Sequence, residues 1–403
     1  MREKTEVLVV GGGYAGVMAA NRLTKRDDVA VTLVNPRPTF VERIRLHQRV
    51  AGTHDAVVDY RDVLARGVRL VVDAAERIDA PARTVTLAGG GSLGYDYLVY
   101  AVGSGSADPG VPGAAEHAYP IASLEEAERL RPVLEATGPG AAVTVVGAGP
   151  TGIEAATELA EQGYAVTLVC DVLGPYLHAN GRRTVAARMA RLGVTVLAGP
   201  NATVTSVTPE AVRLADGREV PGAVTIWTAG FGVPDLAAHS GLATDPVGRL
   251  RTDETLTSVD DDRVVAAGDS AAPSDLPFRM SCQAAGQLGA IAGDTVLSRI
   301  AGTEPAPVAL AFAGQCISLG RGAGMFEFSR RDDVPVGVHL GGRAGSRLGA
   351  GVKELVCRST VLMLRWEARR PGLVRFPAFV TDPRRREVLR QRSVPAPAGA
   401  ASA

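Results

Sequence analysis

The same glycine-rich turn occurs twice in this chain, each time after an apolar, β-branched segment and before a segment rich in alanine. The first turn, Gly11–Gly16, follows the apolar segment 6–10 and precedes a helical pattern that extends to Leu23. The second turn, Gly147–Gly152, follows 142–146 and precedes a similar helical pattern. Both turns have the spacing G-x-G-x-x-G, so we expect strand, turn and helix in the same order at both places.

The spacing of the glycines suits the binding of a dinucleotide. In such a turn the first glycine permits a tight bend, the second lets a pyrophosphate approach the backbone, and the third lets the helix pack closely on the strand. The helix N-terminus then offers free N–H groups to the anion. One match is weak, because glycine-rich loops often only turn the chain. Two matches, each followed by a further strand-like segment at 29–34 or 164–169, predict an α/β fold with two Rossmann-like dinucleotide-binding domains.

The acidic residue that usually binds the nucleotide ribose is missing in both copies. It is expected at the end of the second strand, where the first unit has Asn35 and the second has Cys170, with Asp171 one position later. Asn35 can still form a hydrogen bond to a ribose hydroxyl. No arginine directly follows the second strand, so the pattern favours NADH over NADPH.

Charge and cysteine spacing exclude several other classes of protein. The 43 basic residues balance the 43 acidic ones, which favours neither a nucleic acid nor an acidic partner. The four cysteines lie far apart and form no C-x-x-C motif, which excludes a zinc ribbon, an iron–sulfur cluster and a thioredoxin-like dithiol. The six histidines are scattered, so no metal site is expected.

The N-terminal segment and the hydropathy pattern bear on location. The chain enters its first apolar segment near Val7, which leaves no room for a signal peptide. No uninterrupted apolar run reaches the roughly 18 residues that a membrane span needs. We therefore expect a cytoplasmic protein, with peripheral contact to the cytoplasmic membrane as an alternative.

Three further motifs complete an ordered set. Residues 95–104 and 224–230 have the pattern of strands that end in small residues, and the segment 255–270 ends in Gly268-Asp269-Ser270. Together with the two glycine turns, this order resembles that of the flavoprotein reductases with two dinucleotide-binding domains. Within them it is similar to the branch of the type II NADH dehydrogenases (NADH:quinone oxidoreductases) and the apoptosis-inducing-factor-like proteins. The similarity extends from about residue 5 to about residue 300, and the last hundred residues match only loosely.

The resemblance implies FAD and NAD(P)H as cofactors, with the NAD(P)H domain inserted into the FAD domain. The linker-like segment 138–140 and the later return of the Gly268-Asp269 motif agree with an insertion. Beyond a second linker-like segment, glycine-rich strand patterns and one helix predict a small α+β region. The expected limits are 1–120 and 247–302 for the FAD-binding domain, 121–246 for the NAD(P)H-binding domain, 303–392 for the C-terminal β layer and amphipathic helix, and 393–403 for a disordered tail.

The resemblance also assigns residues to each cofactor. The residues expected to hold FAD are Gly11, Gly13, Tyr14, Ala15, Gly16, Asn35, Ala101, Gly103, Gly268 and Asp269. The residues expected to hold NAD(P)H are Gly147, Gly149, Thr151, Gly152 and Gly230.

Charged residues near the two turns take roles by the same resemblance, each with a plainer alternative. Glu154 lies where a glutamate of the family reaches the nicotinamide ring; the alternative is an acidic residue that complements the helix dipole. Arg43 and Arg45 lie where related enzymes approach the flavin, and a cation there would stabilise the reduced form; the alternative is a solvated helix start. We interpret His47, in the same segment, as structural.

Gln283 and Gln287 belong to a segment, 282–287, that resembles the A-Q-x-A-x-Q run of type II NADH dehydrogenases, with Cys282 in place of the first alanine. In those enzymes the two glutamines line the opening for the quinone above the flavin. Glutamines four residues apart share one helix face. That placement suits the lining of a pocket, and it suits a polar helix surface equally well.

A helix is expected at 352–369, because apolar residues recur there with a period of 3.6. One face carries Val352, Leu355, Val356, Leu362, Met363 and Trp366, and arginines dominate the other. One interpretation is a helix in a membrane interface, as in type II NADH dehydrogenases. The other is a helix that docks on the FAD domain or on a second subunit in a homodimer.

These observations together predict an FAD-dependent NAD(P)H oxidoreductase. Hydride passes from the nicotinamide to flavin N5, and electrons then pass to an acceptor, most simply a quinone. One alternative is a reductase for a small redox protein. Another is a flavin-binding NAD(P)H sensor with little turnover, as in apoptosis-inducing-factor-like proteins.

Overall fold

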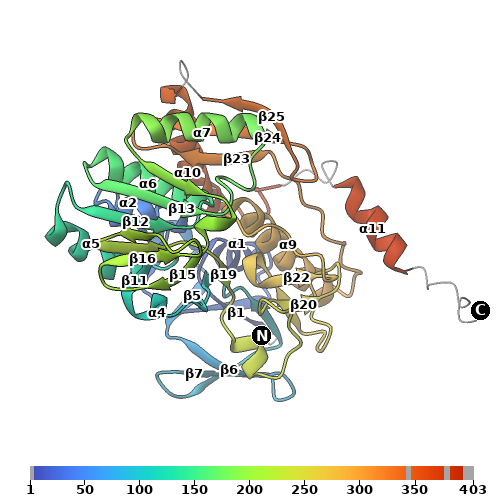
Figure 1. The fold of residues 1–403 in the computed structure, drawn as a ribbon. Helices are drawn as coiled ribbons and strands as arrows, with labels where there is room; N and C mark the ends of the chain where they lie inside the picture. Colours follow the sequence, from blue (N-terminus) through green and yellow to red (C-terminus); the bar gives the residue numbers. More distant parts are fainter. Residues whose placement is uncertain (1–3, 342–345, 376–381, 394–403) are drawn as a thin grey trace, which may run out of the picture.

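Two five-stranded parallel sheets form the centre of the computed structural model, which describes residues 4–341, 346–375 and 382–393. Helices cover the sheets, and a smaller antiparallel sheet near the C-terminus lies beside the second of them (Figure 1). This arrangement confirms the predicted α/β class with two Rossmann-like units and a small α+β C-terminal region.

The first sheet has the strand order β21-β9-β1-β2-β5. All its pairs are parallel, and α1 (Tyr14–Leu23) connects β1 to β2. The register sets Val10 opposite Val34, so the first glycine turn begins beside the end of β2. The edge strand β21 comes from far along the chain, as an inserted domain requires. The bounds are β1 Thr5–Val10, β2 Val29–Asn35, β5 Val68–Val72, β9 Tyr97–Tyr100 and β21 Val264–Ala266.

The second sheet repeats this architecture with the strand order β11-β18-β12-β13-β14. The register sets Val146 opposite Val169, as Val10 is set opposite Val34 in the first sheet. Cys170 therefore occupies the position that Asn35 has in the first unit. The bounds are β11 Ala118–Pro120, α5 Leu124–Thr137, β12 Ala142–Val146, α6 Pro150–Glu161, β13 Ala165–Cys170, α7 Ala179–Arg191, β14 Thr195–Ala198 and β18 Val224–Trp227.

Short elements connect and cover the two sheets. Two three-stranded antiparallel sheets are formed by β6 Ala75–Asp79, β7 Thr84–Leu87 and β8 Ser92–Gly94, and by β15 Val204–Val207, β16 Ala211–Leu214 and β17 Glu219–Pro221. Two-stranded pairs are β3 Thr39–Val41 with β4 Val57–Asp59, β10 Gly105–Ser106 with β19 Phe231–Gly232, and β20 Leu250–Thr252 with β22 Ala271–Pro273. The short helices are α2 Leu46–Val50, α3 Tyr60–Val63, α4 Ala114–His117 and α8 Leu236–His239, with 3-10 turns at 43–45, 200–202 and 268–270.

Helix α9 (Cys282–Ile300) packs tightly on α1, and small residues make this approach possible. A Cβ atom built on Gly289 would lie 2.2 Å from the carbonyl oxygen of Ala15. A Cβ atom on Gly293 would lie 2.9 Å from Cβ of Arg22. The glycines of α9 thus bring it against the helix that follows the first turn.

The C-terminal region is a three-stranded antiparallel sheet followed by two helices. Helix α10 begins at Ser346, earlier than the predicted 352, and ends at Arg369 as predicted. It is fixed to α1 by a buried ion pair between Arg22 and Glu367 and by the Asn21 amide, which donates to the carbonyl of Leu364 at 3.2 Å. The bounds are β23 Gly314–Ser318, β24 Gly324–Ser329, β25 Pro335–Leu340, α10 Ser346–Arg369 and α11 Pro383–Ser393.

Only part of the face of α10 that looks apolar in the sequence is buried: Val352, Val356 and Met363 are half-buried, and Met363 packs on the core. Leu355, Leu362 and Trp366 are exposed, whereas the side chains packed inward include Lys353 and Glu367. The 3.6-residue periodicity therefore predicted the helix itself. The face that the helix buries is held by ion pairs as well as by apolar contacts. Of the predicted tail 393–403, all but Ser393, which ends α11, lies outside the described residues.

Among the helices that the structure describes, none combines the length and the apolar character needed to cross a membrane.

The packing of α1 on α9 makes a paired prediction for two glycines of one helix. We expect Gly289→Ala to lower the free energy of unfolding by roughly 1–3 kcal/mol, because the methyl group overlaps the Ala15 carbonyl. We expect Gly286→Ala, whose Cβ meets no atom within 4 Å, to raise it by about 0.5–1 kcal/mol. Urea unfolding of both variants measures the two changes. Equal effects would contradict the close approach of the helices.

Candidate active site

The two glycine turns have matching backbone geometry. The amide of Gly11 donates to the Val34 carbonyl at 2.9 Å, and the amide of Gly147 donates to the Val169 carbonyl at 2.8 Å. Gly11 has φ +105° and Gly147 has φ +102°, a region that residues with a side chain rarely adopt. The same backbone geometry therefore occurs at the carboxyl edge of each parallel sheet.

The second and third glycines of each turn have different surroundings, as a phosphate cradle requires. A Cβ atom on Gly16 would lie 1.8 Å from the Gly11 carbonyl oxygen, and one on Gly152 would lie 1.9 Å from that of Gly147. Gly13 and Gly149, by contrast, meet nothing within 4 Å. These two residues are the N-caps of α1 and α6 and provide no capping side chain. The first N–H groups of both helices are therefore free for an anion.

A cavity of about 390 Å³ opens beside the first turn. It is lined by most of the residues predicted to hold FAD, namely Gly11, Gly13, Tyr14, Ala15, Asn35, Arg43, Ala101, Gly103, Gly268 and Asp269. Gly16 lies behind the turn, where it packs on Gly11. Tyr60, Ser104 and Ala285 also line the cavity. Sequence reasoning assigned none of them to FAD: Tyr60 belongs to no motif, while Ser104 and Ala285 lie in the motifs 95–104 and 282–287 but were given no role.

Polar contacts fix the shape of this cavity at both ends. The Asn35 side-chain carbonyl accepts from the Gly12 amide at 2.9 Å, and the Tyr60 hydroxyl donates to the Gly12 carbonyl at 2.8 Å. At the other end the Ser104 hydroxyl donates to Asp269 Oδ2 at 2.7 Å, and Arg43 Nη1 donates to the same hydroxyl at 3.0 Å. A cleft lined by free helix N–H groups, the Asn35 amide and the Arg43 cation fits FAD.

Thr228, directly after β18, packs against the second turn. Its hydroxyl lies 2.9 Å from the Val146 carbonyl and 3.0 Å from the Gly147 carbonyl. Gly230 follows in an exposed position with φ +83°. Thr151 lies in the first turn of α6, half-buried. The predicted NAD(P)H residues thus gather at one edge of the second sheet.

Glu154 lies one turn into α6 and is held by the C-terminal region. Its Oε1 atom is 2.8 Å from Lys353 Nζ and accepts from the Ser318 amide at 2.9 Å. Burial alone would raise the pKa of Glu154, but the Lys353 ammonium, His47 and the Ser318 amide together outweigh burial and the pKa is lowered. Burial would likewise lower the pKa of Lys353, and the carboxylate raises it instead. The pair therefore stays ionised although both side chains are buried.

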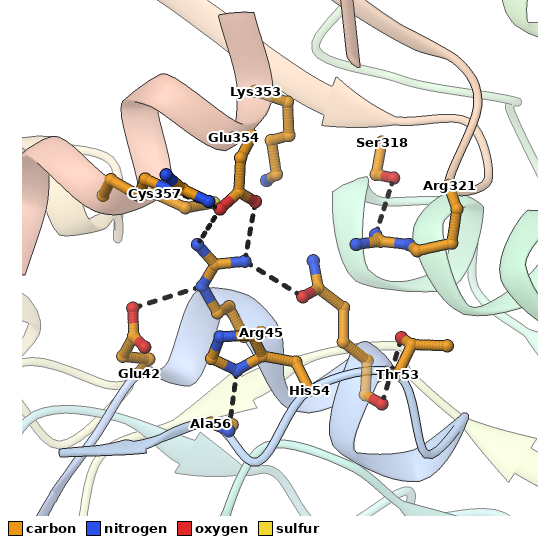
Figure 2. A network of polar contacts seen from close by, with 12 residues as sticks. Glu42, Arg45, Thr53, His54, Ala56, Ser318, Arg321, Lys353, Glu354 and Cys357 are labelled. Atoms are coloured by element: carbon orange, nitrogen blue, oxygen red, sulfur yellow. Dashed lines mark hydrogen bonds and ion pairs between the residues drawn. The ribbon is translucent and has the colours of Figure 1, made fainter. Parts of the chain in front are cut away.

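Arg43 and Arg45 have different surroundings. Arg43 lines the cleft, where its Nη1 atom is 3.7 Å from Asp269 Oδ2. Arg45 is buried outside it, paired with Glu42 at 3.2 Å and with both oxygens of Glu354 at 2.9 and 3.0 Å (Figure 2). The structure thus brings Arg43 to the cleft and places Arg45 in a network that connects the first unit to α10.

Gln287 is occupied by contacts within the protein. Its amide nitrogen donates to the carbonyls of Gln283 and Ala311, both at 3.1 Å. Gln283 is half-buried one turn earlier. The two glutamines share one side of α9, as predicted, but Gln287 fixes the segment after the helix. Their contact with an acceptor stays a prediction.

Two glycine turns of this geometry, one at the edge of each parallel sheet, are typical of the oxidoreductases that bring a bound flavin and a diffusible pyridine nucleotide together. Residues 5–289 match the family described as pyridine nucleotide-disulphide oxidoreductase. The chain belongs to this family, and it is an oxidoreductase that uses FAD and NADH.

Individual proteins within and near this family are similar to the chain over most of its length. An NADH dehydrogenase-like protein of Mycobacterium tuberculosis is 32% identical over 325 residues, which cover 73% of this chain and 80% of the relative. The type II NADH:quinone oxidoreductase of the same organism is 28% identical over 345 residues, 74% of each chain. The fold is similar to that of NDH2 from Plasmodium falciparum, solved in complex with NADH, with a TM-score of 0.75, 17% identity, and coverage of 92% of this chain and 99% of that one.

The burial of His47 predicts how stability depends on pH. Burial lowers the pKa of His47 to about 4, although the nearby Glu154 carboxylate opposes this. As the pH falls, His47 is therefore protonated in the unfolded chain before it is protonated in the folded one. The free energy of unfolding decreases as the pH falls from about 6.5 towards 4, by about 3 kcal/mol at most.

We expect His47→Gln to lose much of this dependence, and the exposed His239→Gln to retain it. Urea unfolding at pH 7 and pH 4.5 measures the difference. Identical pH profiles for His47→Gln and the wild type would contradict the assignment.

Proposed function

We propose that this protein is an NADH:quinone oxidoreductase. The observation that carries the proposal is the matched pair of glycine turns, each at the carboxyl edge of a parallel sheet with an uncapped helix behind it. The relative from M. tuberculosis named type II NADH:quinone oxidoreductase supports the choice of acceptor. Bound FAD supplies the chemistry, as hydride acceptor and as electron donor to the quinone.

The residues of the chain bind and orient the partners. The α6 N-terminus and Thr228 hold the turn that binds the NADH pyrophosphate, and Glu154 is the carboxylate offered to the nicotinamide end. Arg43 places a cation in the lining of the first cleft, where it would stabilise negative charge on a bound, reduced flavin. Gln283, at the start of α9, faces the acceptor side. NADH is preferred to NADPH, because no Lys or Arg directly follows Cys170 in the sequence and the Asp171 carboxylate would repel a 2′-phosphate.

Separate half-reactions test this proposal. Anaerobic mixing with NADH should bleach the flavin band, and menadione should then restore it. Glu154→Ala should slow flavin reduction, or raise the NADH concentration that gives half the maximal reduction rate, by about 10-fold or more. Asp171→Ala should mainly weaken the preference for NADH over NADPH. Stopped-flow absorbance measures both steps.

Three results would contradict the proposal. Rapid bleaching followed by no reoxidation with any quinone would favour a sensor with little turnover. Reoxidation only by a small redox protein would favour a reductase for such a partner. An unchanged reduction rate and NADH affinity in Glu154→Ala would remove that residue from the site.

We also propose that the exposed face of α10 contacts the cytoplasmic membrane. Leu348, Leu355 and Leu362 recur every seven residues on this face and lead to Trp366, all of them exposed. Arg358 and Arg369 are exposed beside this row. Apolar side chains flanked by arginines suit an interface with anionic lipid headgroups.

Vesicle binding tests the membrane contact. We expect the protein to float with vesicles that contain phosphatidylglycerol. The double variant Leu355→Ser with Trp366→Ser should lower the bound fraction at least ~10-fold, because each substitution removes about 1.5–3 kcal/mol of favourable free energy from burying an apolar side chain in the membrane. Val72→Ser with Val259→Ser, at exposed positions elsewhere, is the matched control. A wild-type dimer that the α10 variant converts to a monomer would instead assign this face to a second subunit.

A further inference from the structure

The first glycine turn is held by two side chains at its second residue, Gly12. The Gly12 amide donates to Asn35 Oδ1 at 2.9 Å, and the Gly12 carbonyl accepts from the Tyr60 hydroxyl at 2.8 Å. Asn35 is the last residue of β2 and Tyr60 is the first of α3, so the two contacts come from separate elements. All three residues are buried. Both polar backbone groups of Gly12 are therefore fixed by side chains of the protein itself.

The Tyr60 contact requires glycine at this position. A Cβ atom on Gly12 would lie 2.0 Å from the Tyr60 hydroxyl oxygen and 2.9 Å from Asn35 Cγ, so no side chain fits while both contacts exist. The turn therefore begins with three consecutive glycines, 11–13, whose backbone has unusually many accessible conformations. The two contacts restrict the conformational freedom that these glycines introduce.

The second turn is held in a different way. Ala148 occupies the position of Gly12, and its carbonyl accepts from the backbone amide of Gly174 at 3.0 Å. Cys170, at the position of Asn35, has no oxygen to accept from the Ala148 amide. The contacts from an asparagine and a tyrosine are thus specific to the first turn, and removing one of them leaves the second turn intact.

Tyr60 is held in a position and a protonation state that suit this contact. Its ring belongs to the apolar core around α1, and Asp59 caps α3 by accepting from the Arg61 amide at 2.8 Å. Burial raises the pKa of Tyr60, although Arg37 opposes this, so the hydroxyl keeps its proton and remains a hydrogen-bond donor.

The Tyr60 contact acts on the part of the turn that faces the first cleft. The C=O and N–H of a trans peptide point in opposite directions, and no cis peptide bond occurs in the described part of the chain. By holding the Gly12 carbonyl, Tyr60 therefore also fixes the direction of the Gly13 N–H. Gly13 lines the cleft and is the N-cap of α1, where the free N–H groups begin.

We propose that Tyr60 is a positioning residue for FAD, whose hydroxyl holds the first glycine turn in the conformation that binds the pyrophosphate. It acts through Gly12 and raises the fraction of flavin-free protein that is ready to bind. A turn fixed in advance also loses less conformational freedom when its ligand binds. The inference depends on FAD binding and is independent of the electron acceptor, so it stands apart from the proposed reduction of quinone.

Tyr60→Phe tests the proposal, because it removes the hydroxyl and keeps the ring. Titration of the flavin-free, full-length protein with FAD, followed by flavin fluorescence, should show binding about 10-fold weaker than in the wild type. The affinity for NADH, measured on the same protein by NADH fluorescence, should change less than about twofold, because the second turn keeps all its contacts.

Tyr164→Phe is the matched control. The Tyr164 hydroxyl donates to the Leu134 carbonyl at 2.7 Å, so this variant also removes a hydroxyl bound to a backbone carbonyl, but in the second unit. Its affinity for FAD should stay within about twofold of the wild type. A loss of FAD affinity equal to that of Tyr60→Phe would assign the effect to a general loosening of the fold and would overturn the positioning role.

Gly12→Ala breaks the same contact from the side of the turn. It should weaken FAD binding at least as much as Tyr60→Phe, because its methyl group displaces the hydroxyl. Adding Tyr60→Phe to Gly12→Ala should cause no further loss, since both substitutions remove one and the same contact. Losses that add would show that Tyr60 contacts FAD itself and would overturn a role through Gly12.

Amide hydrogen exchange provides a readout without FAD. In the flavin-free protein, a peptide fragment that contains residues 11–16 should exchange faster in Tyr60→Phe than in the wild type. A fragment that contains residues 147–152 should exchange at the same rate in both proteins. Unchanged exchange in the first turn would mean that the turn is fixed without the hydroxyl, which contradicts the proposal.

The outcomes separate this inference from the proposed function. A wild type that binds FAD but reduces no quinone would overturn the proposed function alone, and the FAD affinities would still decide the role of Tyr60. An FAD affinity of Tyr60→Phe within about twofold of the wild type, or equal losses for FAD and NADH, would overturn the role of Tyr60 alone. If Tyr60→Phe does not fold, Gly12→Ala decides the question, and an unchanged FAD affinity in that variant would overturn the proposal.

Discussion

The close approach of a helix to a strand at each glycine turn is the constraint on which the structure depends. Only a residue without Cβ fits at Gly16 and Gly152, because the carbonyl oxygen of the first glycine lies where Cβ would be. This contact points the uncapped helix N-terminus at the carboxyl edge of its sheet. The same contact, repeated in two parallel sheets, provides two nucleotide sites.

The C-terminal region is part of the site rather than an appendage. Lys353 of α10 and Ser318 of β23 hold Glu154, while Glu354 of the same helix holds Arg45. The same helix presents leucines and a tryptophan outward. One element thus connects the proposed membrane face to Glu154, the carboxylate proposed to meet the nicotinamide. Removing one member of the buried Lys353–Glu154 pair would leave a charge without compensation, so the two residues depend on each other.

Much of the fold and part of the site could be predicted from the sequence. The glycine turns, their strands and the lining of the first cleft depend on local spacing, and local spacing is visible in a sequence. The inward face of α10 could not be predicted, because Lys353 and Glu367 are buried only through partners on α6 and α1, far away in the chain. Arg45 was assigned to the flavin by its neighbourhood in sequence, whereas Glu354, more than 300 residues later, holds it elsewhere.

His47 is a second residue whose surroundings the sequence did not predict. Its sequence context gave it a structural role, and only the packing of α2 on α6 places it between two carboxylates. The i, i+4 spacing of Glu154 and Glu158 was the signal present in the sequence, but a spacing alone does not say what lies opposite. Longer-range ion pairs and buried polar contacts of this kind depend on tertiary packing, which a single sequence does not reveal.

The flavin content of the purified protein tests the central claim most directly. The account predicts one FAD per chain, released on denaturation and identified by chromatography, and a Gly13→Leu variant that folds but retains none because its side chain fills the cradle. A folded wild-type protein that is colourless and takes up no flavin when FAD is supplied would contradict the account.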